Sequence, residues 1–134
     1  MSSFKIFDIA ASGMMAQSTR LNTVASNLAN AESVASSEEG AYKARRPVFQ
    51  TILDENQNVR GVQVKGITEK NAPAQMLYEP GNPLADSKGY IYKSNVNPIE
   101  EMTDMISASR SYQNNIEVMN TVKQLMLNTL RLGQ

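Results

Sequence analysis

Apolar residues at both ends of the chain repeat with the spacing of a helix–helix seam. Near the N-terminus they recur at alternating steps of three and four residues, with Ser18 as one polar slot: Phe4, Phe7, Ala11, Met14, Ser18, Leu21, Ala25 and Leu28. Near the C-terminus the same steps run through Met102, Met105, Ser109, Tyr112, Ile116, Met119, Lys123, Met126 and Leu130. A period of about 3.5 residues is typical of coiled coils, so the pattern predicts long helices over residues 4–31 and 98–131.

The start of the second helix is marked by its local sequence. Asn97 is a preferred N-cap residue, Pro98 suits the first helical position, and Glu100 lies at the third. Glu101 and Asp104 add negative charge near the positive end of the helix dipole. We therefore assign these acidic residues to an exposed first turn rather than to a metal or acid–base site.

Two residues are expected to end the helices. Asn30 lies at the end of the first helix, and asparagine tolerates the left-handed conformation of a C-cap. Arg131 lies in the last turn of the second helix, and Gly133 follows it and closes the helix. Both positions support the helix boundaries that the apolar spacing predicts.

Residues 32–97 lack the helical spacing of the two chain ends and differ from them in composition. Small and polar residues fill 32–41, which is expected to be a flexible link. Short β-like runs follow, at 42–53, 59–68 and 89–96, and the polar stretch 54–58 predicts a hairpin turn between the first two. The turn-rich segment 78–83 contains two prolines and cannot form a central strand.

The predicted architecture is α+β. Residues 1–31 and 98–134 form a discontinuous domain whose two helices pair as an antiparallel coiled coil, and residues 32–97 form a β-rich insert. Further apolar rows flank the seams, and a chain of 134 residues has nothing left to cover them. We therefore expect the helices to pack between subunits of an assembly, through Phe4, Phe7, Met14, Leu21, Asn27, Leu28, Asn30, Met102, Met105, Tyr112, Ile116, Met119, Val122, Met126 and Leu130.

Composition excludes several function classes. Cysteine and histidine are absent, which removes thiolate and imidazole metal sites and the common nucleophile–base pairs. The 13 basic residues equal the 13 acidic residues, so the chain lacks the excess positive charge of a nucleic-acid binder. No apolar run reaches the ~20 residues of a membrane span, and the first residues lack the apolar core of a secretory signal peptide. We expect no cofactor, no bound metal and no direct membrane span.

Two other function classes stay open at this point. The seams are also compatible with an ordinary helical bundle, and a cytosolic helical adaptor would bind a partner through such helices. A carboxylate-dependent enzyme would need convergent acids in a pocket, for which the sequence gives no support, and the serines of the second helix have no base beside them. An adaptor or an enzyme would be fully folded as a small species, whereas an assembly subunit would gain helix on association.

Motifs at opposite ends of the chain resemble the bacterial flagellar rod and hook protein family. The segment Ala25-Ser-Asn-Leu-Ala-Asn30, followed by a link and Gly40-Ala-Tyr-Lys43, is similar to the signature that ends the family's first helix. Ser94-Asn-Val-Asn97 and the helix after it resemble the C-terminal motif. Ser26 stands where the family has asparagine, and the link before Gly40 is longer than usual. The short chain and the segment 78–83 point to a proximal-rod member.

The resemblance implies a structural role and not an enzyme. Proteins of this family form the rod, the drive shaft of the flagellar basal body, which crosses the periplasm and passes torque to the hook. Their subunits are exported unfolded by the flagellar type III apparatus, without a cleavable signal peptide. A similar chain is expected to bind other copies of itself, other rod proteins and the export apparatus. Its terminal helices would line the inner tube, with the β-rich insert outside.

Overall fold

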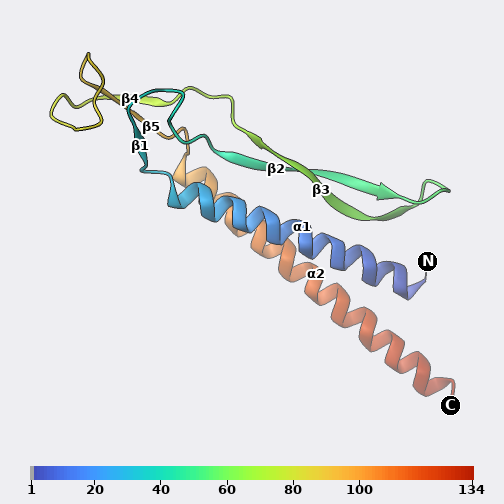
Figure 1. Cartoon of the computed structure of the whole chain (residues 1–134). Helices are drawn as coiled ribbons and strands as arrows, with labels where there is room; N and C mark the ends of the chain where they lie inside the picture. Colours follow the sequence, from blue (N-terminus) through green and yellow to red (C-terminus); the bar gives the residue numbers. More distant parts are fainter. Residues whose placement is uncertain (1) are drawn as a thin grey trace.

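The computed structural model describes residues 2–134 and shows an elongated molecule (Figure 1). Two long helices lie side by side, and the strands lie along and beyond them. The elements in chain order are α1 (Ser3–Ala29), β1 (Val34–Ala35), β2 (Arg45–Leu53), β3 (Val59–Glu69), β4 (Gln75–Tyr78), β5 (Tyr90–Lys93) and α2 (Pro98–Leu132). This arrangement confirms the predicted α+β fold, with long terminal helices and a β-rich insert between them.

The two helices run antiparallel, and both chain ends lie at the same end of the molecule (Figure 1). Two contacts define their register. Asn27 donates a hydrogen bond to Glu101 at 3.0 Å, and a Cβ at Gly13 would lie 2.9 Å from the amide nitrogen of Asn115. α1 has 27 residues and α2 has 35, so the last turns of α2 extend past the start of α1. We call residues 124–132 the overhang.

The row of α2 that faces α1 is shifted by one residue from the sequence-based assignment. The spacing suggested Met102, Ser109 and Ile116, but Met102 is 57% exposed and Ile116 is 36% exposed. The buried positions lie one residue before Met102, Ser109 and Lys123 of the expected row, at Glu101, Ala108 and Val122. Ala108 is a small residue in this row, and it allows a closer approach of the helices than a larger apolar residue would. The other half of the expected seam is half-buried, at Met105, Tyr112, Met119 and Met126.

α1 is covered on two sides, by α2 and by the hairpin of β2 and β3 (Figure 1). The hydroxyl of Ser12 accepts a hydrogen bond from the Val62 backbone N–H at 3.1 Å and donates one to the Ile9 carbonyl at 2.7 Å. Gly61 is buried beside it, and a Cβ there would lie 2.5 Å from the Ser12 hydroxyl oxygen. The absence of a side chain at Gly61 therefore lets the hairpin lie directly against α1.

The hairpin has the predicted turn. β2 and β3 pair antiparallel from Arg45 opposite Glu69 to Leu53 opposite Val59, with two irregularities in register. The carboxylate of Asp54 accepts hydrogen bonds from the backbone N–H groups of residues 56 and 58 at 2.9 and 2.8 Å. The bond from residue 58 is the main reason why the pKa of Asp54 lies below its usual value. The turn at residues 54–58 is thus confirmed.

A second sheet has the strand order β1-β5-β4, with both pairings antiparallel. β1 falls in the segment that was expected to be a flexible link, and its two residues pair with β5. Ile91 of β5 is 2% exposed, and Ala41, Ala44 and Val96 are buried as well. The turn-rich segment begins at the end of β4, an edge strand, and the chain returns to β5 through Gly89, whose φ of 86° favours glycine.

The helix ends agree with the predicted positions but not with every predicted conformation. The Asn97 side chain accepts hydrogen bonds from the second and third helical N–H groups at 3.0 and 3.4 Å, which confirms it as the N-cap of α2. Asn30 is the C-cap of α1, but its φ of −103° and ψ of 6° are not left-handed, so that part of the prediction was wrong. Its side-chain amide instead donates a second hydrogen bond to the Ser26 carbonyl, at 2.8 Å, which also accepts the Asn30 backbone N–H at 3.2 Å.

Candidate subunit-packing site

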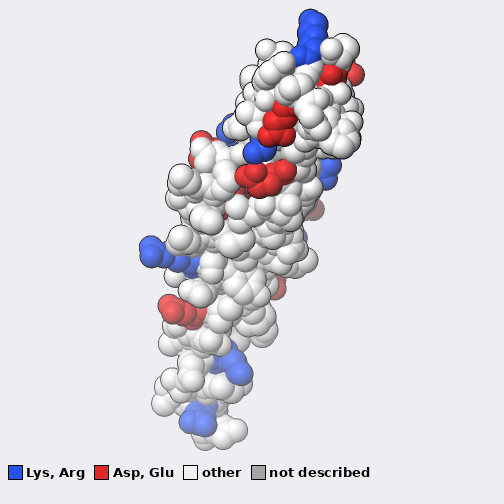
Figure 2. All heavy atoms as spheres, turned by 90° about the vertical axis from the view of Figure 1, so that its left-hand side faces the viewer, with Lys and Arg blue, Asp and Glu red and all other residues white. Residues whose placement is uncertain are grey.

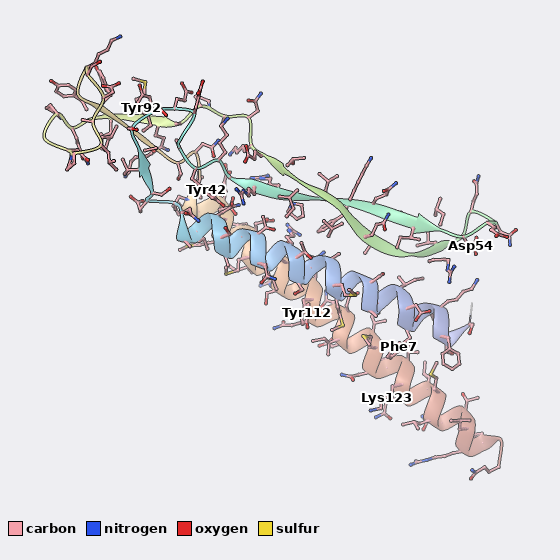
Figure 3. The ribbon with its side chains drawn as sticks, viewed as in Figure 1. Phe7, Tyr42, Asp54, Tyr92, Tyr112 and Lys123 are labelled. Atoms are coloured by element: carbon pink, nitrogen blue, oxygen red, sulfur yellow. The ribbon has the colours of Figure 1, made fainter. Side chains whose placement is uncertain are left out.

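A buried polar junction joins the inner ends of both helices to the start of the hairpin. Asn27 is fully buried, with 0% exposure. Its Nδ2 donates to the Arg45 carbonyl at 2.8 Å and to the Glu101 carboxylate at 3.0 Å. Its Oδ1 accepts from the Arg45 N–H at 2.9 Å and from the Tyr42 hydroxyl at 3.0 Å. Tyr42 lies beside the C-terminal end of α1 (Figure 3). This one amide therefore makes all four of its hydrogen bonds and connects three segments of the chain.

A second amide, that of Asn95, holds the two ends of the hairpin together. Its Oδ1 accepts from the Ala44 N–H at 2.7 Å, just before β2. Its Nδ2 donates to the carbonyls of Lys70 and Ala72 at 3.0 and 2.8 Å, just after β3. Because Asn95 lies shortly before α2, these bonds fix the base of the hairpin next to the start of that helix. We use the term polar junction for Asn27, Tyr42, Asn95 and Glu101.

Glu101 does not lie on an exposed first turn, as the sequence analysis expected. It is 3% exposed, and its carboxylate contacts Asn27 between the helices. The helix register explains the difference, since the fourth residue of α2 turns toward the last turns of α1. Composition and spacing identified the helix start correctly but did not show which acidic side chain faces the other helix.

The two neighbouring acidic residues form ion pairs. The Glu100 carboxylate lies 3.1 Å from the ammonium of Lys70 and 3.5 Å from the guanidinium of Arg46, which connects α2 to both strands of the hairpin base. Asp104 pairs with Arg20 of α1. These groups are partly exposed to solvent, so each pair contributes at most about 1 kcal/mol. Within residues 2–134 no group of His, Cys, Asp and Glu side chains is arranged to hold a metal ion.

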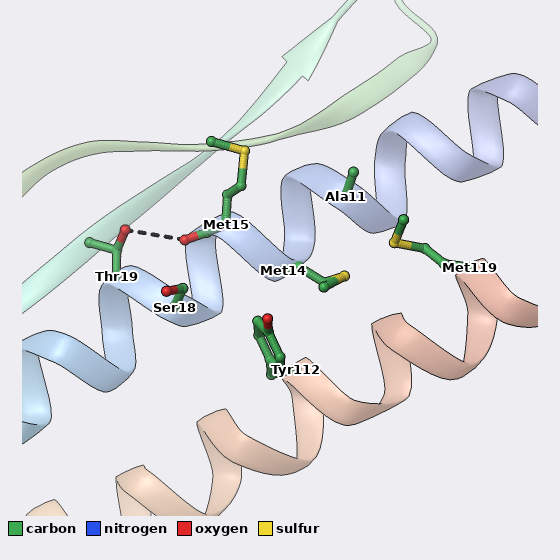
Figure 4. A pocket seen from close by; sticks show the side chains of 7 residues that line it. All are labelled: Ala11, Met14, Met15, Ser18, Thr19, Tyr112 and Met119. Atoms are coloured by element: carbon green, nitrogen blue, oxygen red, sulfur yellow. Dashed lines mark hydrogen bonds between the residues drawn. The ribbon is translucent and has the colours of Figure 1, made fainter.

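An apolar groove lies between the helices, midway along the pair (Figure 4). Its volume is about 510 Å³, and it is open to solvent. Met14 and Tyr112 project into the space between α1 and α2, and Met119 reaches toward α1 from a position two turns further along α2. The two helices therefore do not pack tightly against each other along this side, and the groove leaves part of their apolar surface exposed to solvent.

The overhang of α2 carries apolar side chains that the rest of the chain leaves exposed. Leu125, Leu130 and Leu132 are 57%, 67% and 89% exposed. Phe4, at the start of α1, is 73% exposed at the same end of the molecule. Charged side chains of both signs are scattered over the face drawn in Figure 2, with wide uncharged areas between them. Among residues 2–134, neither helix has an apolar stretch long enough to cross a bilayer.

Comparison with known proteins gives the same assignment at both chain ends and over the full length. Residues 7–34 match the family described as flagella basal body rod protein, and residues 87–132 match the flagellar basal body rod FlgEFG protein C-terminal family. The flagellar basal-body rod protein FlgC of Salmonella typhimurium is 53% identical over 134 residues, which is 100% of both chains. The FlgC proteins of Escherichia coli O6:H1 and of Buchnera aphidicola from Acyrthosiphon pisum are 52% and 44% identical, again over 100% of both chains.

The chain belongs to the flagellar basal-body rod protein FlgC family. The resemblance found in the sequence is thereby confirmed. In this FlgC-family chain the two matched regions meet at the polar junction, because Asn27 lies in the first region and Asn95 and Glu101 lie in the second. The segments that carried the resemblance are thus the ones that hold the helices and the hairpin together.

The residues proposed from the sequence for subunit packing differ in their exposure within the single FlgC-family chain. Asn27 and Val122 are buried, and four others are exposed, at Phe4, Met102, Ile116 and Leu130. The remaining nine are half-buried, at Phe7, Met14, Leu21, Leu28, Asn30, Met105, Tyr112, Met119 and Met126. Sequence reasoning did not assign Glu101 or Asn95 to a shared buried site. The sequence signal that could have identified them is the Ser94–Asn97 motif, because Asn95 lies within it and Glu101 lies four residues after it.

Proposed function

We propose that this chain is a structural subunit of the bacterial flagellar basal-body rod and assembles through its terminal helices. The observation that carries the proposal is the 53% identity, over the whole of both chains, to a protein named flagellar basal-body rod protein FlgC. The partners are other copies of the chain and other flagellar rod proteins. The role is mechanical and requires no catalytic group.

The exposed apolar surface of the helices supports assembly. Large apolar side chains that remain in water on a helix mark contacts with other proteins. Met102 at one end of α2 and Leu132 at the other are 57% and 89% exposed, and the groove with Met14 and Met119 lies between them. In the proposed assembly these surfaces pack against neighbouring subunits. The packing residues are those that the sequence analysis named.

The two parts of the chain have different tasks in this proposal. Residues 1–31 and 98–134 form the assembly domain, which lines the inner tube of the rod, and residues 32–97 form the outer insert that contacts neighbours. The polar junction supports a firm connection between the two parts, because Asn27 and Asn95 bond to the base of the hairpin from both sides. Torque that enters through either part would then reach the other through buried hydrogen bonds.

Location and export complete the proposal. The rod crosses the periplasm, and the chain reaches it through the flagellar type III export apparatus without a cleavable signal peptide. The decisive experiment removes the gene and restores it with an epitope tag in the exposed loop around residue 81. The tagged chain should restore swimming and co-purify with intact basal bodies. A tagged chain that remains in the cytosol while the deletion strain still builds basal bodies would instead support a cytosolic helical adaptor.

A further inference from the structure

Two strands of the insert have an edge that no other strand of the chain covers. The sheets have the orders β1-β5-β4 and β2-β3, so β2 is paired on one side only, by β3, and β4 on one side only, by β5. β2 and β4 belong to different sheets and do not contact each other within residues 2–134. An uncovered strand edge presents N–H and C=O groups that can pair with a strand of another chain.

The hydrogen bonds of β3 show which residues of β2 face the free edge. In an antiparallel pair, two opposite residues either exchange both backbone bonds or both turn away from each other's strand. The Val62 N–H of β3 donates to the Ser12 hydroxyl of α1, so Val62 turns away from β2. Thr51 is opposite Val62 and therefore turns away from β3, and so does Phe49 two residues before it. The backbone groups of Phe49 and Thr51 thus point to the free edge of β2.

The outward residues of β4 follow from the same alternation. The Glu79 N–H, just after β4, donates to the Gly89 carbonyl, just before β5, at 2.9 Å. Counting back from this bond, Leu77 bonds to β5, whereas Met76 and Tyr78 turn to the free edge. Each of the two free edges therefore presents two outward residues that are two positions apart.

The two edges match in length and in their lack of charge. Irregularities in register interrupt β2 between Val48 and Phe49 and between Ile52 and Leu53, which leaves a regular stretch at residues 49–52. β4 also has four residues. Natural edges are commonly protected by charged side chains, proline or bulges, and in β2 all of these lie outside or at the borders of the regular stretch. β4 contains no charged residue and no proline.

We propose that residues 49–52 of β2 pair antiparallel with β4 of a second copy of the chain. Thr51 then lies opposite Met76 of the second copy, and Phe49 lies opposite its Tyr78. In this register every outward N–H and C=O group of one strand meets an outward group of the other, so each of these two pairs exchanges both of its backbone hydrogen bonds.

The side chains along both edges favour the same contact. Ile52 of β2 is 37% exposed, and Met76 and Tyr78 of β4 are 58% and 61% exposed. Apolar side chains on adjacent strands cover one another, and such cross-strand pairs stabilise a sheet. The pairing would therefore remove apolar surface from water on both copies.

A second copy is the proposed partner because one chain carries both edges, and this step rests on the proposed function. A contact between two different surfaces continues from copy to copy, as an axial assembly requires, whereas β2 against β2 would give a closed pair. Four residues a side bury far less than the roughly 1,000 Å² of a stable interface. The pairing therefore forms where the helices of the assembly already hold neighbouring copies together, and not in the dilute chain.

Disulfide cross-linking in purified basal bodies tests the pairing, because the chain has no cysteine of its own. In the proposed register Gln50 lies opposite Leu77 of the second copy at a non-hydrogen-bonded position, where Cα atoms are about 4.5 Å apart. Gln50→Cys with Leu77→Cys should therefore form disulfides between copies on mild oxidation. A non-reducing gel should show a ladder of dimers and larger species.

A matched control places the cysteine one strand further away. Gln63 of β3 is opposite Gln50 and is also exposed. Strands are about 4.8 Å apart, which puts position 63 beyond disulfide reach of the second copy, so Gln63→Cys with Leu77→Cys should cross-link about tenfold less.

Thr51→Pro in the double-cysteine chain separates strand pairing from proximity alone. The Thr51 N–H points to the free edge, so proline removes a bond to the second copy and none to β3. Cross-linking should fall to the level of the control, while circular dichroism of the purified chain shows that its fold is kept.

Basal bodies that contain the double-cysteine chain with no more cross-linking than the control would overturn the proposal. Dimers formed by Gln50→Cys alone would overturn it in favour of β2 against β2, and undiminished cross-linking in folded Thr51→Pro would exclude backbone pairing. Ile52→Cys with Gln75→Cys, the other non-hydrogen-bonded pair, serves if the first chain does not restore swimming. Absence of the epitope-tagged chain from intact basal bodies would instead contradict the proposed function, and the pairing with it.

Discussion

Replacing Asn95 with alanine tests how much the polar junction stabilises the molecule. The change removes one hydrogen bond at 2.7 Å to the Ala44 N–H and two, at 3.0 and 2.8 Å, to the carbonyls of Lys70 and Ala72. Ala44 is 1% exposed, so its N–H would stay unpaired, which costs about 1–3 kcal/mol. Lys70 and Ala72 are half-buried residues, so their carbonyls would gain partial access to water. The expected loss in the free energy of unfolding is about 2–4 kcal/mol in total.

Urea unfolding of the full-length chain, followed by circular dichroism, measures this loss. With a slope of about 1–3 kcal/mol per molar urea, the unfolding midpoint should fall by roughly 1–2 M. Asn71→Ala is the matched control, because Asn71 is exposed and makes no side-chain hydrogen bond among the described residues. The control should remain within about 0.5 kcal/mol of the unsubstituted chain. If Asn95→Ala unfolds at the same urea concentration as Asn71→Ala, the junction does not hold the hairpin base in the way described.

Three further changes test other parts of the molecule. Gly61→Ala should destabilise the chain by about 1–3 kcal/mol, because the new Cβ would lie 2.5 Å from the Ser12 hydroxyl oxygen. Thermal melts of the two variants measure this loss. Gly66→Ala is the control and should not show it, because nothing lies within 4 Å of the new Cβ. Backbone hydrogen bonds hold the pKa of Asp86 below its unfolded value of 3.8. Their contribution to the free energy of unfolding is therefore present above pH 3.8 and disappears as the pH falls through the lower folded pKa. When stability is measured as the pH is lowered, Asp86→Asn should therefore lack this part of the pH dependence. If the variant and the unsubstituted chain lose stability identically in acid, the hydrogen bonds of Asp86 do not stabilise the fold in this way. Met119→Asp places a charge in the groove between the helices. The variant should be made and exported but build no rod. Normal swimming of cells with this variant would show that the groove is not an assembly contact.

The sequence by itself determined the elements whose signals are local. The apolar spacing at both chain ends predicts helices, because a helix buries one stripe whatever its partner is. Asn97 followed by Pro98 fixes the start of α2, since both residues act on the backbone beside them. The polar stretch at residues 54–58 produces the hairpin turn through bonds made by Asp54 alone. The motifs at the two ends also sufficed to identify the family.

Tertiary structure decided which of several apolar rows is buried and which polar residues meet. Residues 101 and 102 are neighbours in sequence, yet Glu101 is buried and Met102 is exposed, because the position of α1 selects one row over the next. β1 has only two residues and exists through its pairing with β5, which no local propensity reveals. The hydrogen bond from Asn27 to Glu101 joins residues 74 positions apart. A spacing pattern describes how one segment presents its own side chains, whereas burial and hydrogen-bond partners depend on the surface that another segment brings to it.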